Sequence, residues 1–215
     1  MCFVGRENDI VQIKEVLTEG NNVIILGKHG IGRTNLIRHI AKTTKDRWRF
    51  IFMDFSRTPG EIRNHLLSKL FPMQEFGRRH TEYRSSRFRI ATLALDDRRK
   101  HILVLNNISK LYTQKRDSLR YLAWEKRFQF VSTVESFLSL NDLFLFRVQM
   151  NLSILIMLQY LTTSDVVHFI IQLSKEHPLG WTEVRIKNLA EVTGGYPLRM
   201  REIALRELEQ SGMDH

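Results

Sequence analysis

VIILGKHGIGRT, residues 23–34, is the most informative stretch of the sequence. Its first four residues form a short continuous apolar run, which is typical of a strand buried on both faces of a parallel sheet. The next eight residues fit the phosphate-loop pattern G-x-x-x-x-G-K-[ST] at both glycines and at the final threonine, but Arg33 replaces its lysine. We therefore expect a strand followed by a candidate phosphate-binding loop.

The residues after this loop favour a helix, because residues 35–42 place four apolar side chains on one side at helical spacing. Gly27, Gly30 and Gly32 let successive backbone N–H groups face one concavity, and the start of the helix adds partial positive charge. Thr34 offers a hydroxyl group for Mg²⁺. The alternative is a glycine-rich turn that binds nothing.

Two further positions bear on catalysis. Arg33 keeps a positive charge but presents a planar fork that is bulkier than the lysine ammonium. The apolar run of residues 101–105 ends in Asn106 and Asn107, where hydrolysis requires carboxylates. An amide accepts a hydrogen bond but is not a general base. The sequence therefore predicts weak hydrolysis or none.

The remaining pattern alternates apolar runs with helical periodicity. Strands are expected at residues 23–26, 50–55, 101–105, 128–133 and 154–158, and the segment 72–94 is expected to be a loop with a helical piece. This alternation predicts an α/β core with a five-stranded parallel sheet over residues 1–161. Helical patterns alone follow, and they predict a small helical lid over residues 162–215.

The net charge is +10, and it is concentrated between Arg78 and Arg127, where 14 Lys/Arg face 5 Asp/Glu. Such a segment favours DNA, other nucleic acid or an acidic protein as a partner, or else it is a solvated basic face. No apolar run approaches the roughly 18 residues of a membrane span. With no secretory pattern at the start and a single cysteine, we expect a cytoplasmic protein without membrane association.

Five motifs in order resemble the AAA+ superfamily of P-loop ATPases, in the branch shared by origin-recognition/Cdc6-like proteins and STAND-like signalling ATPases. Phe3–Glu7 (FVGRE) resembles the opening box, and GKHGIGRT resembles a degenerate Walker A loop. HILVLNN resembles a degenerate Walker B strand with Asn-Asn in place of the carboxylates. Ser132-Thr133 resembles the sensor-1 position, and residues 193–199 (TGGYPLR) resemble the lid signature.

The resemblance implies a site for ATP or ADP with Mg²⁺. It points to Thr34 and Asn106 as the magnesium positions and to Arg199 or Arg201 as the lid arginine. Arg147 is either an arginine finger for a neighbouring subunit or an ordinary surface residue. His29 is either a phosphate contact or a solvent-facing loop residue. The full set of expected nucleotide contacts is Val4, Gly5, Arg6, Gly27, His29, Gly30, Ile31, Gly32, Arg33, Thr34, Asn35, Thr133, Pro197 and Arg199.

Three functions remain open. The first is a nucleotide-binding regulatory or assembly subunit with little hydrolysis, which works with other subunits or with copies of itself. The second is an active ATPase whose missing carboxylate comes from Asp54, Glu135 or a neighbouring subunit. The third is a nucleic-acid-binding adaptor on an inactive scaffold. The chain stops soon after the lid helix, so we expect either a minimal subunit or other functions in partner proteins. Residues 137–146 are expected in the core or a subunit interface, and Trp48, Trp124 and Trp181 in packing positions.

Overall fold

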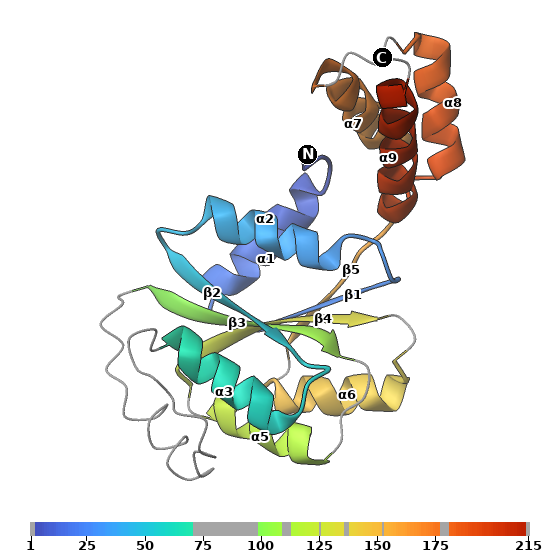
Figure 1. The fold of residues 1–215 in the computed structure, drawn as a ribbon. Helices are drawn as coiled ribbons and strands as arrows, with labels where there is room; N and C mark the ends of the chain where they lie inside the picture. The colour runs from blue at the N-terminus through green and yellow to red at the C-terminus, as the bar shows by residue number, and fades with distance from the viewer. Residues whose placement is uncertain are drawn as a thin grey trace.

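The computed structural model describes residues 3–70, 99–108, 113–124, 126–135, 138–151, 153–176 and 181–213, with side chains to residue 209 (Figure 1). The described strands are β1 (Val23–Gly27), β2 (Trp48–Asp54), β3 (Lys100–Ile108), β4 (Phe128–Glu135) and β5 (Ile154–Met157). The described helices are α1 (Glu7–Thr18), α2 (Arg33–Thr43), α3 (Pro59–Leu70), α5 (Thr113–Trp124), α6 (Leu140–Gln149), α7 (Thr163–Glu176), α8 (Glu183–Thr193) and α9 (Pro197–Met213).

The five strands form one parallel sheet in the order β2-β3-β4-β1-β5, which confirms the predicted fold class. The third strand is longer than expected and continues to Ile108. Asn107 adopts a left-handed conformation with φ 59°, and the pairing of β3 with β4 shifts between Leu105 and Ile108. This irregularity lets the strand pass the two asparagines and pair again with Val134.

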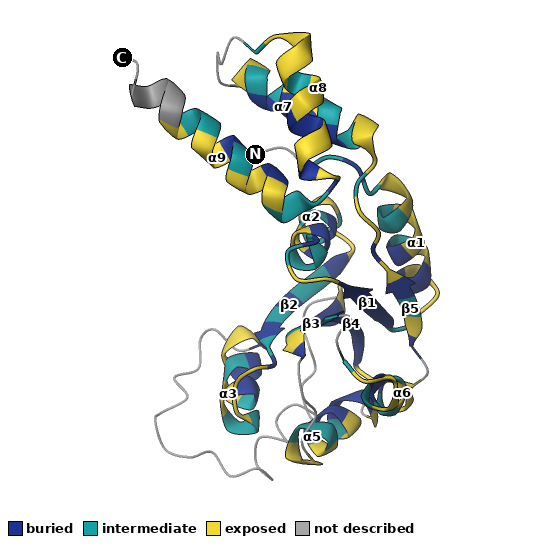
Figure 2. Cartoon of the chain, turned by 90° about the vertical axis from the view of Figure 1, so that its right-hand side faces the viewer, coloured by how far each residue is buried: buried dark blue, intermediate teal, exposed yellow. Residues whose placement is uncertain are grey.

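Helices cover both faces of the sheet (Figures 1 and 2). α1 and α2 pack on one face around Val23 and Ile25, while α3, α5 and α6 pack on the other around Ile24 and Leu26. Adjacent residues of β1 thus serve opposite cores, which explains why the strand is apolar at each position before Gly27.

The last three helices pack around a separate apolar cluster that includes Phe169 and Met200. A capping box begins α7: the Thr162 N–H and hydroxyl donate to Asp165 Oδ2 at 3.0 and 2.7 Å, and the Asp165 N–H donates to Thr162 Oγ1 at 3.2 Å. The turn before α9 lies against the chain entering α7, because the Leu161 N–H donates to the Gly195 carbonyl at 2.9 Å. The lid thus has its own core and a crossing of two segments at its base.

The sequence patterns did not identify α5, and they did not predict that residues 140–149 form a helix, α6. They also placed Trp124 wrongly among the packing residues, since this side chain ends α5 and is 78% exposed. Trp48 is buried and Trp181 packs against the lid cluster, as expected. The expected loop and helical piece over residues 72–94 lie outside the described residues. None of the described helices is long and apolar enough to cross a membrane.

Candidate functional site

The glycine loop lies at the topological switch point of the sheet, between β1 and β4. From β1 the chain crosses to β2 through α2 on one face, and from β4 it crosses to β5 through α6 on the other. The carboxyl ends of β1 and β4 therefore flank a crevice, which is the usual ligand position in an open parallel sheet. Gly30 and Gly32 have φ values of 74° and 96°, and α2 begins directly after Gly32.

A cavity of about 330 Å³ lies between this loop and the lid. The expected nucleotide contacts that line it are Val4, Arg6, His29, Gly30, Ile31, Gly32, Arg33, Thr34, Asn35 and Pro197. The chain also contributes Phe3, Asn107, Glu135, Leu161, Phe169, Leu198, Met200 and Arg201. One side of the cavity is therefore a glycine loop, and the other side is largely apolar and comes from the N-terminal segment and the lid.

Along with Arg6, Arg33 is one of two arginines with largely buried side chains that line this cavity. Its side chain is only 10% exposed, and its Nη2 lies 3.2 Å from Oε1 of Glu135, the last residue of β4. The other terminal nitrogen, Nη1, is buried and makes no hydrogen bond within the described part of the chain. Burial lowers the pKa of Arg33, and the hydrogen bond and charge of Glu135 partly oppose this effect. A buried guanidinium with an unused donor suits an anionic ligand.

The expected magnesium positions lie together. Asn106 Oδ1 accepts a hydrogen bond from the Thr133 hydroxyl at 3.0 Å and one from the Thr34 hydroxyl at 3.4 Å. Thr133 does not line the cavity but is connected to Thr34 through this amide. The arrangement joins the ends of β3 and β4 to the start of α2 at one corner. It provides neutral oxygen atoms, which carry less negative charge for Mg²⁺ than a carboxylate would.

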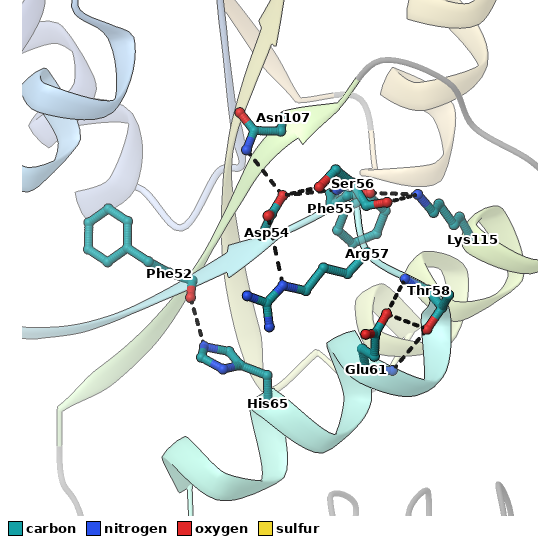
Figure 3. A network of polar contacts seen from close by, with 10 residues as sticks. All are labelled: Phe52, Asp54, Phe55, Ser56, Arg57, Thr58, Glu61, His65, Asn107 and Lys115. Carbon is teal, nitrogen blue, oxygen red and sulfur yellow. Dashed lines mark hydrogen bonds and ion pairs between the residues drawn. The ribbon is translucent and has the colours of Figure 1, made fainter.

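Asn107 and Asp54 form a second group at the same edge of the sheet (Figure 3). Asn107 Nδ2 donates to Asp54 Oδ1 at 3.1 Å, and the same oxygen accepts the N–H and hydroxyl of Ser56 at 3.0 and 2.7 Å. Burial, the largest single effect, raises the pKa of Asp54, but these hydrogen bonds and the charge of Arg57 together lower it. The carboxylate is therefore a weak base that is engaged in the turn after β2.

The lid touches the glycine loop directly. The Tyr196 hydroxyl donates to the His29 carbonyl, and a Cβ added to Gly30 would lie 2.8 Å from Leu198 Cβ. Lys28 Nζ donates to the Tyr160 hydroxyl at 3.0 Å, which raises the pKa of Lys28. The rings of Tyr160 and Tyr196 meet edge to face with centroids 5.7 Å apart. The lid thus contacts the loop at His29 and Gly30, and the segment that leads into the lid contacts it at Lys28.

Three expected nucleotide contacts take other places. Gly5 is buried below the lid, where an added Cβ would meet Leu161 and Asp165 at 3.0 Å. Gly27 pairs with Glu135 in the sheet. Arg199 is exposed and does not line the cavity, whereas Arg201, the alternative lid arginine, does.

Arg147 lies near the amino end of β5, whereas the glycine loop lies at the carboxyl end of β1. Its Nε donates to the carbonyl of Ser153 at 3.4 Å, directly before β5. The residue is therefore outside this chain's own cavity. A role toward a neighbouring subunit stays a prediction.

The sequence patterns missed the apolar wall and underrated Glu135. Phe169 and Met200 looked like ordinary core positions of lid helices, and only the packing of the lid over the loop brings them to the cavity. For Glu135 a signal existed. Parallel pairing of two buried strands brings the residue directly after one apolar run beside the first glycine of the loop, as the pair Gly27 and Glu135 shows.

The fold and the strand–glycine loop–helix unit define the class of P-loop nucleoside triphosphatases. A family model described as AAA domain (dynein-related subfamily) matches residues 22–172, so the chain belongs to the AAA family. No curated protein matches the sequence.

Solved structures share the fold at low sequence identity. A structure of the Aeropyrum pernix Orc1 protein in complex with DNA has a TM-score of 0.75 and 16% identity over the whole chain. Cdc6p from Pyrobaculum aerophilum has a TM-score of 0.69 and 15% identity over 96% of the chain. The Thermotoga maritima RuvB Holliday junction branch migration motor has a TM-score of 0.60 and 15% identity over 95%. The chain spans 62% of the length of each of these three proteins.

Proposed function

We propose that the chain is a nucleotide-binding module that binds ATP or ADP, hydrolyses it slowly or not at all, and acts as a regulatory or assembly subunit. One observation carries the proposal. Glu135 is the only acidic side chain among the described residues that line the cavity, and its Oε1 lies 3.2 Å from both Arg33 Nη2 and His29 Nδ1. A carboxylate engaged with these two groups is poorly placed to activate water.

The described residues fit a nucleotide in three ways. The loop N–H groups and the unpaired Nη1 of Arg33 suit phosphate oxygens. The apolar wall with Phe3 and Phe169 suits a base. Thr34 and Asn106 would hold Mg²⁺, which neutralises phosphate charge when bound. We extend the proposal to the division of the chain, with residues 1–161 as the nucleotide-binding core and residues 162–215 as a lid over the base.

Calorimetric titration with MgADP and MgATP tests this proposal. Binding tighter than about 1 mM is expected, which corresponds to about −4 kcal/mol. Gly32→Val should abolish it, because Gly32 has a φ of 96° while its added Cβ meets nothing within 4 Å, so the variant strains the loop backbone without a clash. Gly60→Val is the matched control, since Gly60 also has open space and lies on α3 away from the cavity. Native protein that binds neither nucleotide would refute the proposal.

An active ATPase is the second candidate, and the place of Glu135 on the cavity wall is the observation that favours it. This candidate predicts a turnover of about 1 s⁻¹ or more. It also predicts that Glu135→Gln abolishes turnover, whereas Asp54→Asn, at the neighbouring turn, leaves it measurable. A steady-state phosphate-release assay on the three proteins distinguishes this candidate from the first.

A nucleic-acid adaptor is the third candidate. Of the basic segment 78–127, Arg78, Arg79 and Arg98 lie outside the described residues. The described part contributes Arg99, Lys100, Lys126 and Arg127, which lie where β3 and β4 begin. Arg47, from outside the segment, precedes the neighbouring strand β2 and extends this row of basic residues along the amino ends of the strands. The exposed indole of Trp124 precedes Lys126 by two residues. Positive charge beside an exposed aromatic ring suits single-stranded nucleic acid.

Salt-dependent binding tests this candidate. Lys100→Glu with Lys126→Glu should weaken binding to all single-stranded sequences and reduce the slope of log affinity against log salt by about 0.7 per lost phosphate contact. Trp124→Ala should weaken binding without changing that slope. Lys175→Glu with Lys187→Glu, two exposed lid positions, is the matched charge control. Equal losses in both double variants would show an effect of net charge alone.

A further inference from the structure

The cavity holds one carboxylate, that of Glu135, among the described residues that line it, and this carboxylate lies against the cation of the loop pattern. Glu135 closes β4, and its partner in the sheet is Gly27, the first residue of the loop pattern. Its side chain is 24% exposed, and one oxygen, Oε1, contacts both Arg33 and His29. The negative charge is thus fixed at the loop by two partners from the loop itself.

The ion pair makes the two terminal nitrogens of the Arg33 guanidinium differ in their contacts. Nη2 is engaged by Glu135, and Nη1 remains buried without a partner in the described structure. An arginine fork ordinarily binds a phosphate through two parallel hydrogen bonds. Here Nη1 is available to an incoming anion, whereas a bidentate pairing that uses the Nη2 N–H bonded to Glu135 requires the anion to displace the carboxylate. The backbone N–H groups of the loop are independent of this competition.

Arg33 occupies the position of the pattern lysine, which reaches the β- and γ-phosphates. A diphosphate requires the N–H groups and one arginine donor, and the loop supplies both with Glu135 in place. A triphosphate adds a further charged group beside Arg33, where it competes with the carboxylate for Nη2 and is repelled by it. We infer that Glu135 is a specificity-determining residue that makes the site prefer nucleoside diphosphates over triphosphates. The inference rests on the proposed nucleotide binding.

The ratio of the MgATP and MgADP dissociation constants, measured by calorimetric titration, tests the inference. Neighbouring like charges change ionic equilibria by about 1 to 3 powers of ten, so the native protein should bind MgADP at least about tenfold more tightly. Glu135→Gln keeps the shape and hydrogen-bond capacity but removes the charge, and it should bring the ratio close to one. Glu135→Asp keeps the charge and should retain a preference for MgADP.

Glu15→Gln is the matched control, because it makes the same chemical change on the exposed side of α1 and should leave the ratio unchanged. Native protein that binds MgATP as tightly as MgADP overturns the inference, and this outcome needs no variant to fold. An unchanged ratio in Glu135→Gln overturns it as well while leaving nucleotide binding intact. Absence of binding to either nucleotide overturns the proposed function itself, so the two failures are distinguishable.

Discussion

Asn106 lies at the expected magnesium position and supplies a neutral amide there instead of a charged carboxylate. It connects Thr34 and Thr133 through a single oxygen, so the ends of two strands and the start of α2 stay in register with one another. A carboxylate at this position would do the same and would add the negative charge that Mg²⁺ favours. At this scale, the site keeps the framework of a phosphate loop and has an amide in place of a carboxylate, which is one ground for the proposal of slow hydrolysis.

Replacing Arg33, Asn106 and Asn107 with the lysine and carboxylates expected at these positions should increase the rate of ATP hydrolysis. We expect turnover below about 1 s⁻¹ in the native protein. The variant Arg33→Lys/Asn106→Asp/Asn107→Glu should hydrolyse ATP measurably faster, because it supplies a metal carboxylate and a candidate base together. Arg33→Lys/Asn106→Gln/Asn107→Gln is the control that changes the same positions without adding charge. Native turnover at the ordinary rate, as measured by phosphate release, would contradict the reading of these residues.

Asp54 should make stability depend on pH in acid. Its pKa is lower in the folded protein than in the unfolded chain, so its stabilising effect is full above about pH 4, the unfolded value, and declines as the pH falls through the folded value. The side chain is 38% exposed, and solvent limits the effect at neutral pH to about 1 kcal/mol or less. Urea unfolding of native protein and Asp54→Asn should therefore differ at pH 7 and converge near pH 2. A constant difference would indicate another cause.

The local sequence was sufficient for the parts of the site that lie on one continuous segment. The loop residues 27–34 carry their own geometry through glycine and the adjoining strand and helix, and sequence patterns identified them directly. Glu135 and Phe169 reach the same cavity from 101 and 135 residues beyond the loop's end at Thr34, through strand register and lid packing. Those two contacts depend on tertiary structure, which periodicity in one segment does not encode.

At the scale of elements, the failure to predict α5 has a simple physical cause. α5 buries only one narrow side, with Leu119, Leu122 and Ala123, and most of its other positions are polar or charged. Its amphipathic pattern is therefore weak. β1 is the opposite case, because its burial on both faces makes every position before Gly27 apolar. The breadth of the buried surface thus accounts for the contrast between β1, which was predicted, and α5, which was not.

The two glycines at the base of the lid should respond differently to the same substitution. Gly194→Ala requires a left-handed conformation with φ 55° but meets nothing within 4 Å, so it should cost about 1–2 kcal/mol. Gly195→Ala has a similar φ of 73°, and its Cβ would lie 2.1 Å from the Leu161 carbonyl oxygen. It should destabilise the lid well beyond the first variant. Chemical denaturation of both proteins compares them, and equal losses would show that the crossing at Leu161 relaxes freely.

At the scale of the whole molecule, α6 presents an apolar stripe to solvent. Leu140, Phe144 and Val148 recur every four residues and are 85%, 61% and 48% exposed, while Leu143 and Phe146 from the same helix are buried. The helix thus serves the core on one side and is uncovered on the other. The expectation for residues 137–146, core or subunit interface, fits this division of the described helix, and self-association through the stripe is the proposal that follows.

Removing the stripe should shift the assembly state. Leu140→Ser/Phe144→Ser is expected to lower the mass seen by light scattering at concentrations where the native protein associates, because it removes two large exposed side chains and leaves the buried side unchanged. Val184→Ser/Val192→Ser on α8 is the control, since these residues are also exposed, at 68% and 63%. A native protein that is monomeric across the same concentrations would refute self-association through α6.

The hydrogen bond from Tyr196 to the His29 carbonyl should affect the rates at which a nucleotide binds and dissociates. Because this hydrogen bond connects the lid to the loop beside the cavity, we propose that it opens before a nucleotide enters or leaves. Observed association rates should then level off as nucleotide concentration rises, at the rate of opening. Tyr196→Phe removes the hydroxyl and retains the ring contact with Tyr160, so it should raise that plateau and shorten the residence time of the bound nucleotide. Slow exchange would suit a subunit whose nucleotide marks a lasting state.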